Sequence, residues 1–236
     1  MRRIERNEER GKSELGWLSS RFSYSFSEYL NPTRMNFGVL RVFNHDTVSP
    51  MSGFPMHHHE QMEIVTIMLD GVLTHEDSMG NKEELRKDDV QVMTAGTGIN
   101  HSEWNNDTTN KARLLQIWMY PKDRALLPSY EQHRFGESGR NDCFQLLVSG
   151  IKKEESLSIH QDAAFSRANL LEVGKPTTYT LTNRTNGVFI YVISGEVTIG
   201  ADALHTGDSM EVSDEISFTV VSSVATDILV IEAPRD

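Results

Sequence analysis

The chain has 236 residues, of which 38% are hydrophobic and 24% charged, a composition typical of a globular protein with room for one large or two small β domains. Its formal net charge of -11 argues against direct nucleic-acid binding, which needs clustered Lys and Arg. The single cysteine, Cys143, suits a reducing compartment. No secretory signal is evident, and the longest apolar run, 188–193, is too short to cross a bilayer. We therefore expect a cytoplasmic protein without membrane contact.

Strand patterns dominate the first half of the chain. The segment RFSYSFSEY, 21–29, alternates aromatic residues with serines, which predicts a half-buried strand. Further β-rich runs, separated by Gly, Asn, Asp and Pro, cover 38–44, 63–71, 90–96 and 113–120. The best helical candidate is 122–135, which Pro128 interrupts and which we interpret as a connecting helix or linker.

The strand pattern resumes after this linker and repeats the order of the first half. In both halves a strand, a turn with Gly71 or Gly195, a second strand and another turn lead to an acidic corner at Asp89 or Asp208. Chance similarity between hairpins is the less favoured explanation, because the order matches over a long span. The sequence therefore predicts an all-β bicupin of two double-stranded β-helix barrels related by internal duplication, with domains 1–135 and 136–236.

Two histidine motifs stand at strand spacing in the first half. Side chains two apart on a strand share a face, so His57 and His59 face one side and His58 the other. Glu63 shares the first face if the strand stays regular. His101 and Glu103 form a second pair two residues apart. Imidazoles with a carboxylate are ligands for Fe, Mn, Ni, Cu or Zn, so the pattern indicates a metal site.

Simpler explanations account for the other histidines. We expect His45, His75, His133 and His205 to be solvated surface residues. An affinity-tag remnant is a poor explanation for three consecutive histidines inside the chain, because such tags are terminal and longer.

Several segments resemble the pirin family of the cupin superfamily. Gly53 to Gly71 resembles the first cupin motif, and Gly98 to Asn105 the second. HEDSMGN, VQVMTAGTGINHSE and RFSYSFSEYLNP are more specifically similar to pirins, and the second half resembles the C-terminal cupin of bacterial pirin-like proteins. Two departures are Asp88, where glycine is frequent, and His58, where proline is common.

The resemblance implies one divalent transition metal per chain, held by His57, His59, His101 and Glu103, with Fe(II) favoured over Cu, Ni, Mn, Co or Zn. In most other cupins the carboxylate ligand comes from the first motif, here Glu63. In a pirin, Glu63 would instead lie behind the ligands, where it could orient one of them, or point away from the site. The C-terminal half has only His160 and His205, so we expect no metal there.

Bacterial pirin-like proteins are associated with quercetin 2,3-dioxygenase activity, which implies a small aromatic substrate and O2. A nearby carboxylate, Glu103 or Glu63, could accept the flavonol proton, and we take Glu103 as the catalytic residue. Apolar residues near the motifs suit a planar ligand, although ordinary core packing explains each one equally well. They are Phe54, Met56, Met62, Met93 and Trp104.

Two other functions are open from the sequence. A metal-dependent binding or regulatory protein, such as a redox or transcriptional cofactor with an unknown protein partner, needs an exposed patch that the sequence does not reveal. A sugar isomerase needs polar or basic residues around the metal, and Lys and Arg are scarce near the motifs.

Overall fold

Strands form nearly all the regular structure of this computed structural model, which describes residues 1–151 and 155–235. The first half contains β1 (Arg2–Glu5), η1 (Asn7–Glu9), β2 (Gly11–Glu14), β3 (Leu18–Phe22), β4 (Leu40–Val48), β5 (Ser52–His59), β6 (Glu63–Asp70), β7 (Val72–Asp77), β8 (Lys82–Arg86), β9 (Asp89–Thr94), β10 (Ile99–Asn105), β11 (Ala112–Met119) and β12 (Ser129–Arg134). The second half contains η2 (Glu137–Arg140), β13 (Gln145–Ser149), β14 (Leu157–Ser158), β15 (Ala164–Leu170), β16 (Pro176–Thr180), β17 (Gly187–Ser194), β18 (Glu196–Ile199), β19 (Asp202–His205), β20 (Ser209–Val212), β21 (Ser217–Ser222) and β22 (Thr226–Ala233).

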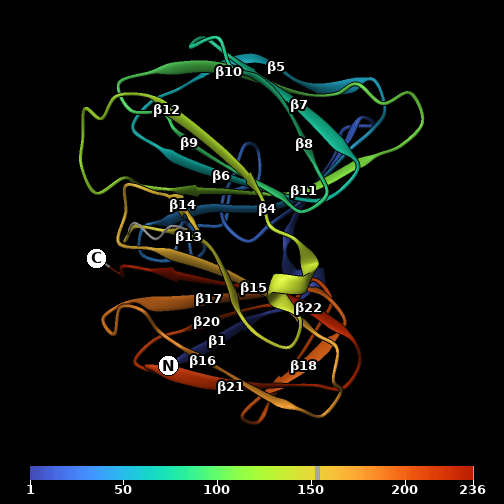
Figure 1. The fold of residues 1–236 in the computed structure, drawn as a ribbon, viewed down its shortest axis with the longest axis vertical. Helices are drawn as coiled ribbons and strands as arrows, with labels where there is room; N and C mark the ends of the chain where they lie inside the picture. The colour runs from blue at the N-terminus through green and yellow to red at the C-terminus, as the bar shows by residue number, and fades with distance from the viewer. Residues whose placement is uncertain (152–154, 236) are drawn as a thin grey trace.

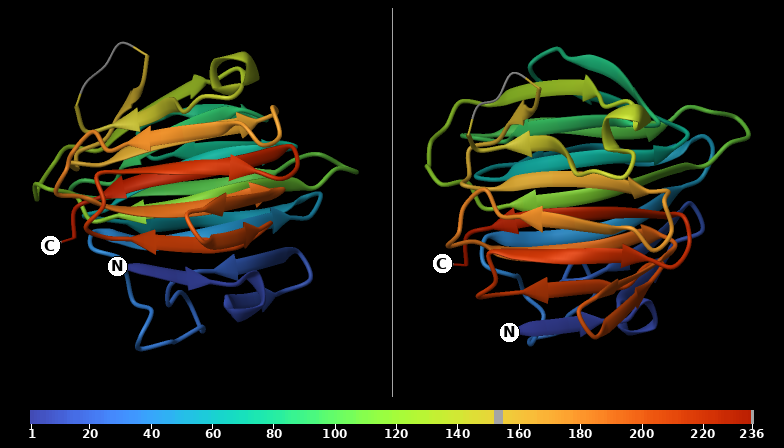
Figure 2. Two further views of the ribbon diagram at one scale, coloured as in Figure 1. Left: turned by 90° about the horizontal axis from the view of Figure 1, so that it is seen from below. Right: turned by 60° about the horizontal axis from the view of Figure 1, so that its bottom comes forward.

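The two halves have the same strand order, which confirms the predicted bicupin. One barrel contains the orders β9-β6-β11-β4 and β5-β10-β7-β8, and the other contains β20-β17-β22-β15 and β16-β21-β18-β19. Each strand from β4 to β11 therefore has a counterpart eleven strands later. The halves stack with their larger sheets facing each other (Figures 1 and 2).

One strand crosses between the halves. β1, at the very start of the chain, pairs with β20 of the second barrel, with Arg2 opposite Val212 (Figure 2). Residues 2–5 therefore extend the second barrel's sheet, although they lie within the predicted first domain, 1–135. The division between residues 135 and 136 stays a prediction.

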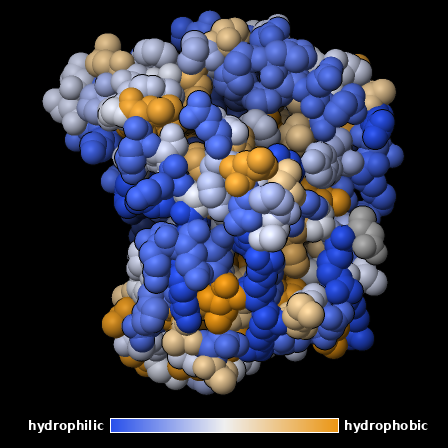
Figure 3. Space-filling view, turned by 180° about the vertical axis from the view of Figure 1, so that it is seen from behind, coloured by the Kyte–Doolittle hydropathy of each residue, from blue (hydrophilic) through white to orange (hydrophobic). Residues whose placement is uncertain are grey.

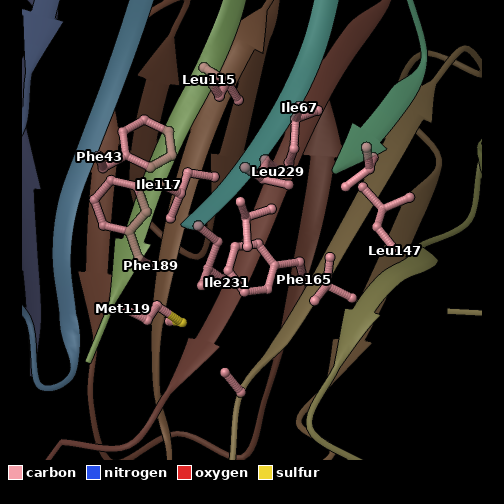
Figure 4. Close-up of a cluster of buried hydrophobic side chains, with 14 of the residues drawn as sticks. Phe43, Ile67, Leu115, Ile117, Met119, Leu147, Phe165, Phe189, Leu229 and Ile231 are labelled. Carbon is pink, nitrogen blue, oxygen red and sulfur yellow. The ribbon is translucent and has the colours of Figure 1, made fainter. Parts of the chain in front are cut away.

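The main core lies between the two large sheets. Figure 4 shows Phe43, Ile117 and Leu115 of the first half packed against Phe189, Phe165 and Leu229 of the second. The rings of Phe43 and Phe189 are 4.6 Å apart. Burial of large apolar side chains stabilises by roughly 1.5–3 kcal/mol each, so this contact holds the barrels together. The face of the molecule shown in Figure 3, seen from behind relative to Figure 1, is mostly hydrophilic, with hydrophobic residues scattered over it.

Two local expectations were wrong. Segment 122–135 contains no helix, since β12 pairs with β9 instead, with Tyr130 opposite Met93. Pro128 removes a donor that a helix would need, and the edge of β9 offers the following residues a full set of partners. The strand predicted over 21–29 ends at Phe22, since the chain bends at residues 23–24 and then makes a turn at Ser27, whose φ is 52°.

Asp88 occupies a turn that usually favours glycine. Its φ is 73°, in the left-handed region that glycine adopts without steric cost. The carboxylate of Asp88 accepts a hydrogen bond from Arg140, a fully buried side chain of η2. The charge pair joins the end of the first half to the start of the second.

Candidate metal centre

Two adjacent strands bring the histidine motifs together. β5 and β10 are antiparallel neighbours, with His101 directly opposite His57 and Ile99 opposite His59. Ring centroids lie 4.4 Å apart for His57 and His101, and 5.0 Å apart for His59 and His101. One ligand atom from each of the three lies within 4.8 Å of the other two. His58 points to the exposed face and contacts Asn100, as strand alternation predicts.

The imidazoles present free nitrogen lone pairs. Nδ1–H of His57 donates to the carbonyl of Pro55 at 2.7 Å, because a carbonyl can only accept, and this leaves Nε2 bare. Nε2 of His101 is buried without a hydrogen-bond partner. A buried nitrogen without a partner is costly in an apolar surrounding, and a metal ion would satisfy it. The donor set therefore fits a first-row transition metal.

Burial favours the neutral form of His101 and His59. It lowers the pKa of His101 to about 3, with further lowering from His57 and His75. Burial also lowers the pKa of His59 to about 4, with help from His101 and His57. Metal ligands must be deprotonated, so the site does not need to release protons from these two rings at neutral pH.

Glu103 lies beside the three histidines but does not belong to the cluster of donor atoms. The register between β10 and β5 shifts between His101 and Glu103, so Glu103 is opposite Phe54. Nε2 of Gln116 donates to both carboxylate oxygens of Glu103, at 3.0 and 2.9 Å, and Oε1 of Gln116 accepts from Thr66 at 3.0 Å. The structure thus holds the Glu103 carboxylate with an amide, and its role as a ligand stays a prediction.

Glu63 does not orient any of the three histidines. Its Oε2 accepts hydrogen bonds from Thr94 Oγ1 at 3.0 Å and from the backbone N–H of His160 at 3.2 Å. The side chain is fully buried, and this burial raises its pKa. Of the two placements expected for Glu63, behind the ligands or pointed away from them, these partners on β9 and in the second half fit the second.

A cavity of about 350 Å³ opens onto the histidines. Aromatic side chains from three separate segments line it, and they include Trp17, Phe22, Phe26, Phe54 and Trp118. His59 packs edge-on against Trp118, with ring centroids 4.8 Å apart. Polar residues also line it, among them Ser20, Asn44, Asp46, Glu103 and Gln116. An apolar slot with a few polar groups is typical of sites for small aromatic ligands.

Of the five apolar residues expected at the site, Phe54 alone lines this cavity. Met56 is 54% exposed, and Met62 and Met93 belong to a small core cluster around Ile64. Trp104 is adjacent to Glu103 on β10, so alternation turns it to the other face. Sequence proximity to a motif was a poor guide, because much of the lining comes from strands distant from the motifs in sequence, among them β3, β4 and β11.

Gln116 was missed, although the sequence contained a signal for it. It is the one amide within the apolar run LLQIWM of β11, and a polar residue inside a buried strand needs a specific partner. His45 and His75, expected to be solvated, were also misjudged. Nδ1 of His45 contacts the Tyr191 hydroxyl at 2.8 Å, and His75 is fully buried. His133 and His205 are exposed, as expected.

The fold and the site define a bicupin with a metal-binding histidine cluster in its first barrel. Residues 3–119 match the family model Pirin, and residues 146–233 match that of the quercetinase C-terminal cupin domain. The chain belongs to the pirin family.

Curated relatives and solved structures are similar over nearly the whole chain. Quercetin 2,3-dioxygenase of Escherichia coli K12 is 37% identical over 227 residues, which is 96% of each chain. A pirin-like protein of Caulobacter vibrioides is 36% identical over 224 residues, 94% of this chain and 95% of that one. The crystal structure of YhhW from Escherichia coli superposes with a TM-score of 0.94 at 36% identity, covering 100% and 99% of the two chains. YhhW in complex with nickel(II) gives a TM-score of 0.93 at 35% identity, covering both chains fully.

Proposed function

We propose that this protein is a metal-dependent dioxygenase that cleaves flavonols such as quercetin with O2 and releases CO. The observation that carries this proposal is the aromatic cavity that ends on the histidine cluster. The name of the Escherichia coli relative supports it. His57, His59, His101 and Glu103 would hold one divalent ion, with Fe(II) our first choice, although nickel(II) is the ion in the YhhW complex.

When bound, such an ion supplies Lewis acidity toward adjacent hydroxyl and carbonyl oxygens of the substrate. The chain itself contributes the rest. Trp118, Phe22 and Phe26 hold a planar ring system and exclude water from it. Glu103 accepts the flavonol hydroxyl proton at a carboxylate oxygen, while the Gln116 amide fixes the direction of that carboxylate. Both atoms of O2 end in the cleaved product, and one ring carbon leaves as CO.

We propose that the protein is located in the cytoplasm. Cys143 is a free, exposed thiol, which suits a reducing compartment. Within residues 1–151 and 155–235, no helix is both long and apolar enough to span a membrane. We expect no direct contact with nucleic acid, because the chain has a net charge of -11.

The test is aerobic quercetin cleavage with CO detection and metal analysis on the same preparation. We expect cleavage by the wild type, loss on chelation, and recovery with Fe(II) or another divalent first-row ion. His101→Ala, given the same total metal, should be inactive, and His58→Ala is the matched control that should retain activity. Equal bleaching by wild type and His101→Ala, or bleaching without CO, would contradict the enzyme and favour the binding or regulatory protein.

A further inference from the structure

His75, a buried histidine outside the metal cluster, lies directly behind His101. His75 is on β7, the neighbour of β10 on the side away from β5. Nδ1 of His75 is 3.5 Å from Nδ1 of His101, and the ring of Tyr130 stacks on the His75 ring with centroids 4.7 Å apart. On its other side, Nε2 of His75 is 3.1 Å from Oδ2 of Asp77. The three side chains form a continuous line from Asp77 through His75 to His101.

Asp77 determines which atom donates and which accepts in each hydrogen bond along this line. Oδ1 of Asp77 accepts from the backbone N–H groups of Met79 at 2.9 Å and Asn81 at 3.1 Å. Oδ2 accepts from Asn81 Nδ2 at 2.8 Å. Asp77 is thus surrounded by donors and acts as an acceptor, so the contact with His75 requires a proton on Nε2 of His75.

The rest of the line follows from this proton. A neutral His75 with its proton on Nε2 has a bare Nδ1, which can only accept. The facing Nδ1 of His101 must therefore donate, so it carries the His101 proton. Nε2 of His101 is then left with its lone pair, and this is the buried atom without a partner that belongs to the metal cluster.

We propose that His75, held by Asp77, is a positioning residue that fixes His101 in the tautomer needed for metal binding. It does not touch the metal or the substrate. A carboxylate, a histidine and a ligand histidine in series raise the basicity of the ligand and lock its ring, and loss of such partners typically costs about 10–100-fold in metal affinity. This proposal rests on the metal site of the proposed function, and it does not depend on which reaction the site performs.

The experiment compares substitutions that change the proton pattern with substitutions that change only volume. His75→Phe keeps a ring against Tyr130 but removes the acceptor, and we expect it to weaken metal affinity about 10–100-fold. His75→Asn leaves a larger void, but its Oδ1 occupies the place of Nδ1 and still accepts from His101. We expect the affinity of His75→Asn to lie closer to the wild type than that of His75→Phe. A role in packing alone gives the reverse order.

Asp77→Asn tests the direction of the protons. The backbone donors of Met79 and Asn81 retain the amide oxygen, so the new NH2 group faces both His75 and the side chain of Asn81. The Asn81 amide then has to turn its oxygen toward this NH2 group, and the NH2 group places the proton of His75 on Nδ1. His101 is then forced to carry its proton on Nε2, which blocks the metal. We expect a loss at least as large as that in His75→Phe. The double variant Asp77→Asn/His75→Phe should be no worse than His75→Phe alone, because the route of the effect is already removed.

Affinity is measured by competition with a chelator for Ni(II), without substrate, and thermal unfolding of each variant reports on folding. His133→Phe, an exposed histidine of β12, is the matched control and should not change affinity. Long-range ¹H–¹⁵N NMR of the metal-free protein should show the His101 proton on Nδ1 in the wild type and on Nε2 in Asp77→Asn. The proposal is overturned if His101 of the wild type carries its proton on Nε2. It is also overturned if the losses of metal affinity in Asp77→Asn and His75→Phe add up in the double variant. If the variants show these changes in metal affinity but the wild type does not cleave quercetin, the proposed reaction is contradicted. The positioning role of His75 and Asp77 is then still supported.

Discussion

Three consecutive histidines on β5 divide between two environments at the scale of single residues. His57 and His59 approach His101 across the strand pair, whereas His58 faces solvent beside Asn100. Alternation along a strand is a local property, so this division was accessible from the sequence. The partners of Glu103 and Glu63 were not, because alternation placed both carboxylates on the same face as the histidines.

The two glutamates should differ in their effect on metal binding. Glu103 lines the cavity with the histidines, and Glu63 bonds to Thr94 and His160 instead. We expect Glu103→Gln to lower metal affinity at least tenfold, because the proposed ligand loses its charge, and Glu63→Gln to leave the affinity near that of the wild type. Chelator competition measures both. The opposite order would place the carboxylate ligand in the first motif, as in most other cupins.

Asp46 should make the stability of the metal-free protein depend on pH. Burial raises its pKa from 3.8 to about 7, and the nearby Glu103 adds to this while Ser20 opposes it. Between these values the folded protein keeps a proton that the unfolded chain releases, so the free energy of unfolding falls as pH rises toward and through 7. Asp46→Asn cannot ionise, and it should gain on the order of 2–4 kcal/mol over the wild type at pH 8 but little at pH 4.

Chemical denaturation at the two pH values measures this effect. The exposed Asp123→Asn is the control, and its stability should follow the wild type at both pH values. An equal gain for Asp46→Asn at pH 4 and pH 8 would mean that ionisation is not the cause.

At the scale of elements, the metal site depends on how closely β5 and β10 approach. Gly53 lies opposite Trp104, and a Cβ added there would meet the backbone oxygen of Glu103 at 2.2 Å and Cα of Trp104 at 2.6 Å. Backbone atoms cannot move aside as a flexible side chain can. Glycine therefore keeps the strand with His57 in register with the strand that carries His101.

Gly53→Ala should separate the two strands. We expect it to destabilise the fold by about 1–3 kcal/mol, the usual cost of overpacking, and to weaken metal binding more than tenfold because the histidines are displaced. Gly136→Ala is the matched control, since the nearest heavy atom to an added Cβ there is 4.0 Å away. Unchanged metal affinity in Gly53→Ala would show that the cluster tolerates a shift of β5.

At the scale of the whole molecule, duplication produced two barrels but one candidate metal site. β16 and β21 occupy the places of β5 and β10 in the second barrel, and their sequences, PTTYT and SFTVVS, contain no histidine. His160 instead reaches the junction near Thr94, and His205 pairs with Glu196 at 3.0 Å. Among the residues that the structure describes, the one cluster of three or more potential ligands is that of His57, His59 and His101.

Elemental analysis of the purified protein should therefore find one tightly bound transition metal per chain. His57→Ala should reduce this to near zero, while His205→Ala, a change at an exposed histidine of the second barrel, should leave it at one. Two tightly bound ions per chain, or one that survives in His57→Ala, would show that the second half binds metal.

The sequence by itself determined the features that follow from local periodicity. Alternation of apolar and polar residues indicated the strands, the repeated order of turns indicated two barrels, and His-x-His spacing separated His57 and His59 from His58. Tertiary structure alone decided which distant segments meet. The aromatic cavity joins β3, β5 and β11, the Gln116 amide holds Glu103, and His75 backs His101. These contacts depend on the order of strands in the sheets, and a period of two residues carries no information about that order.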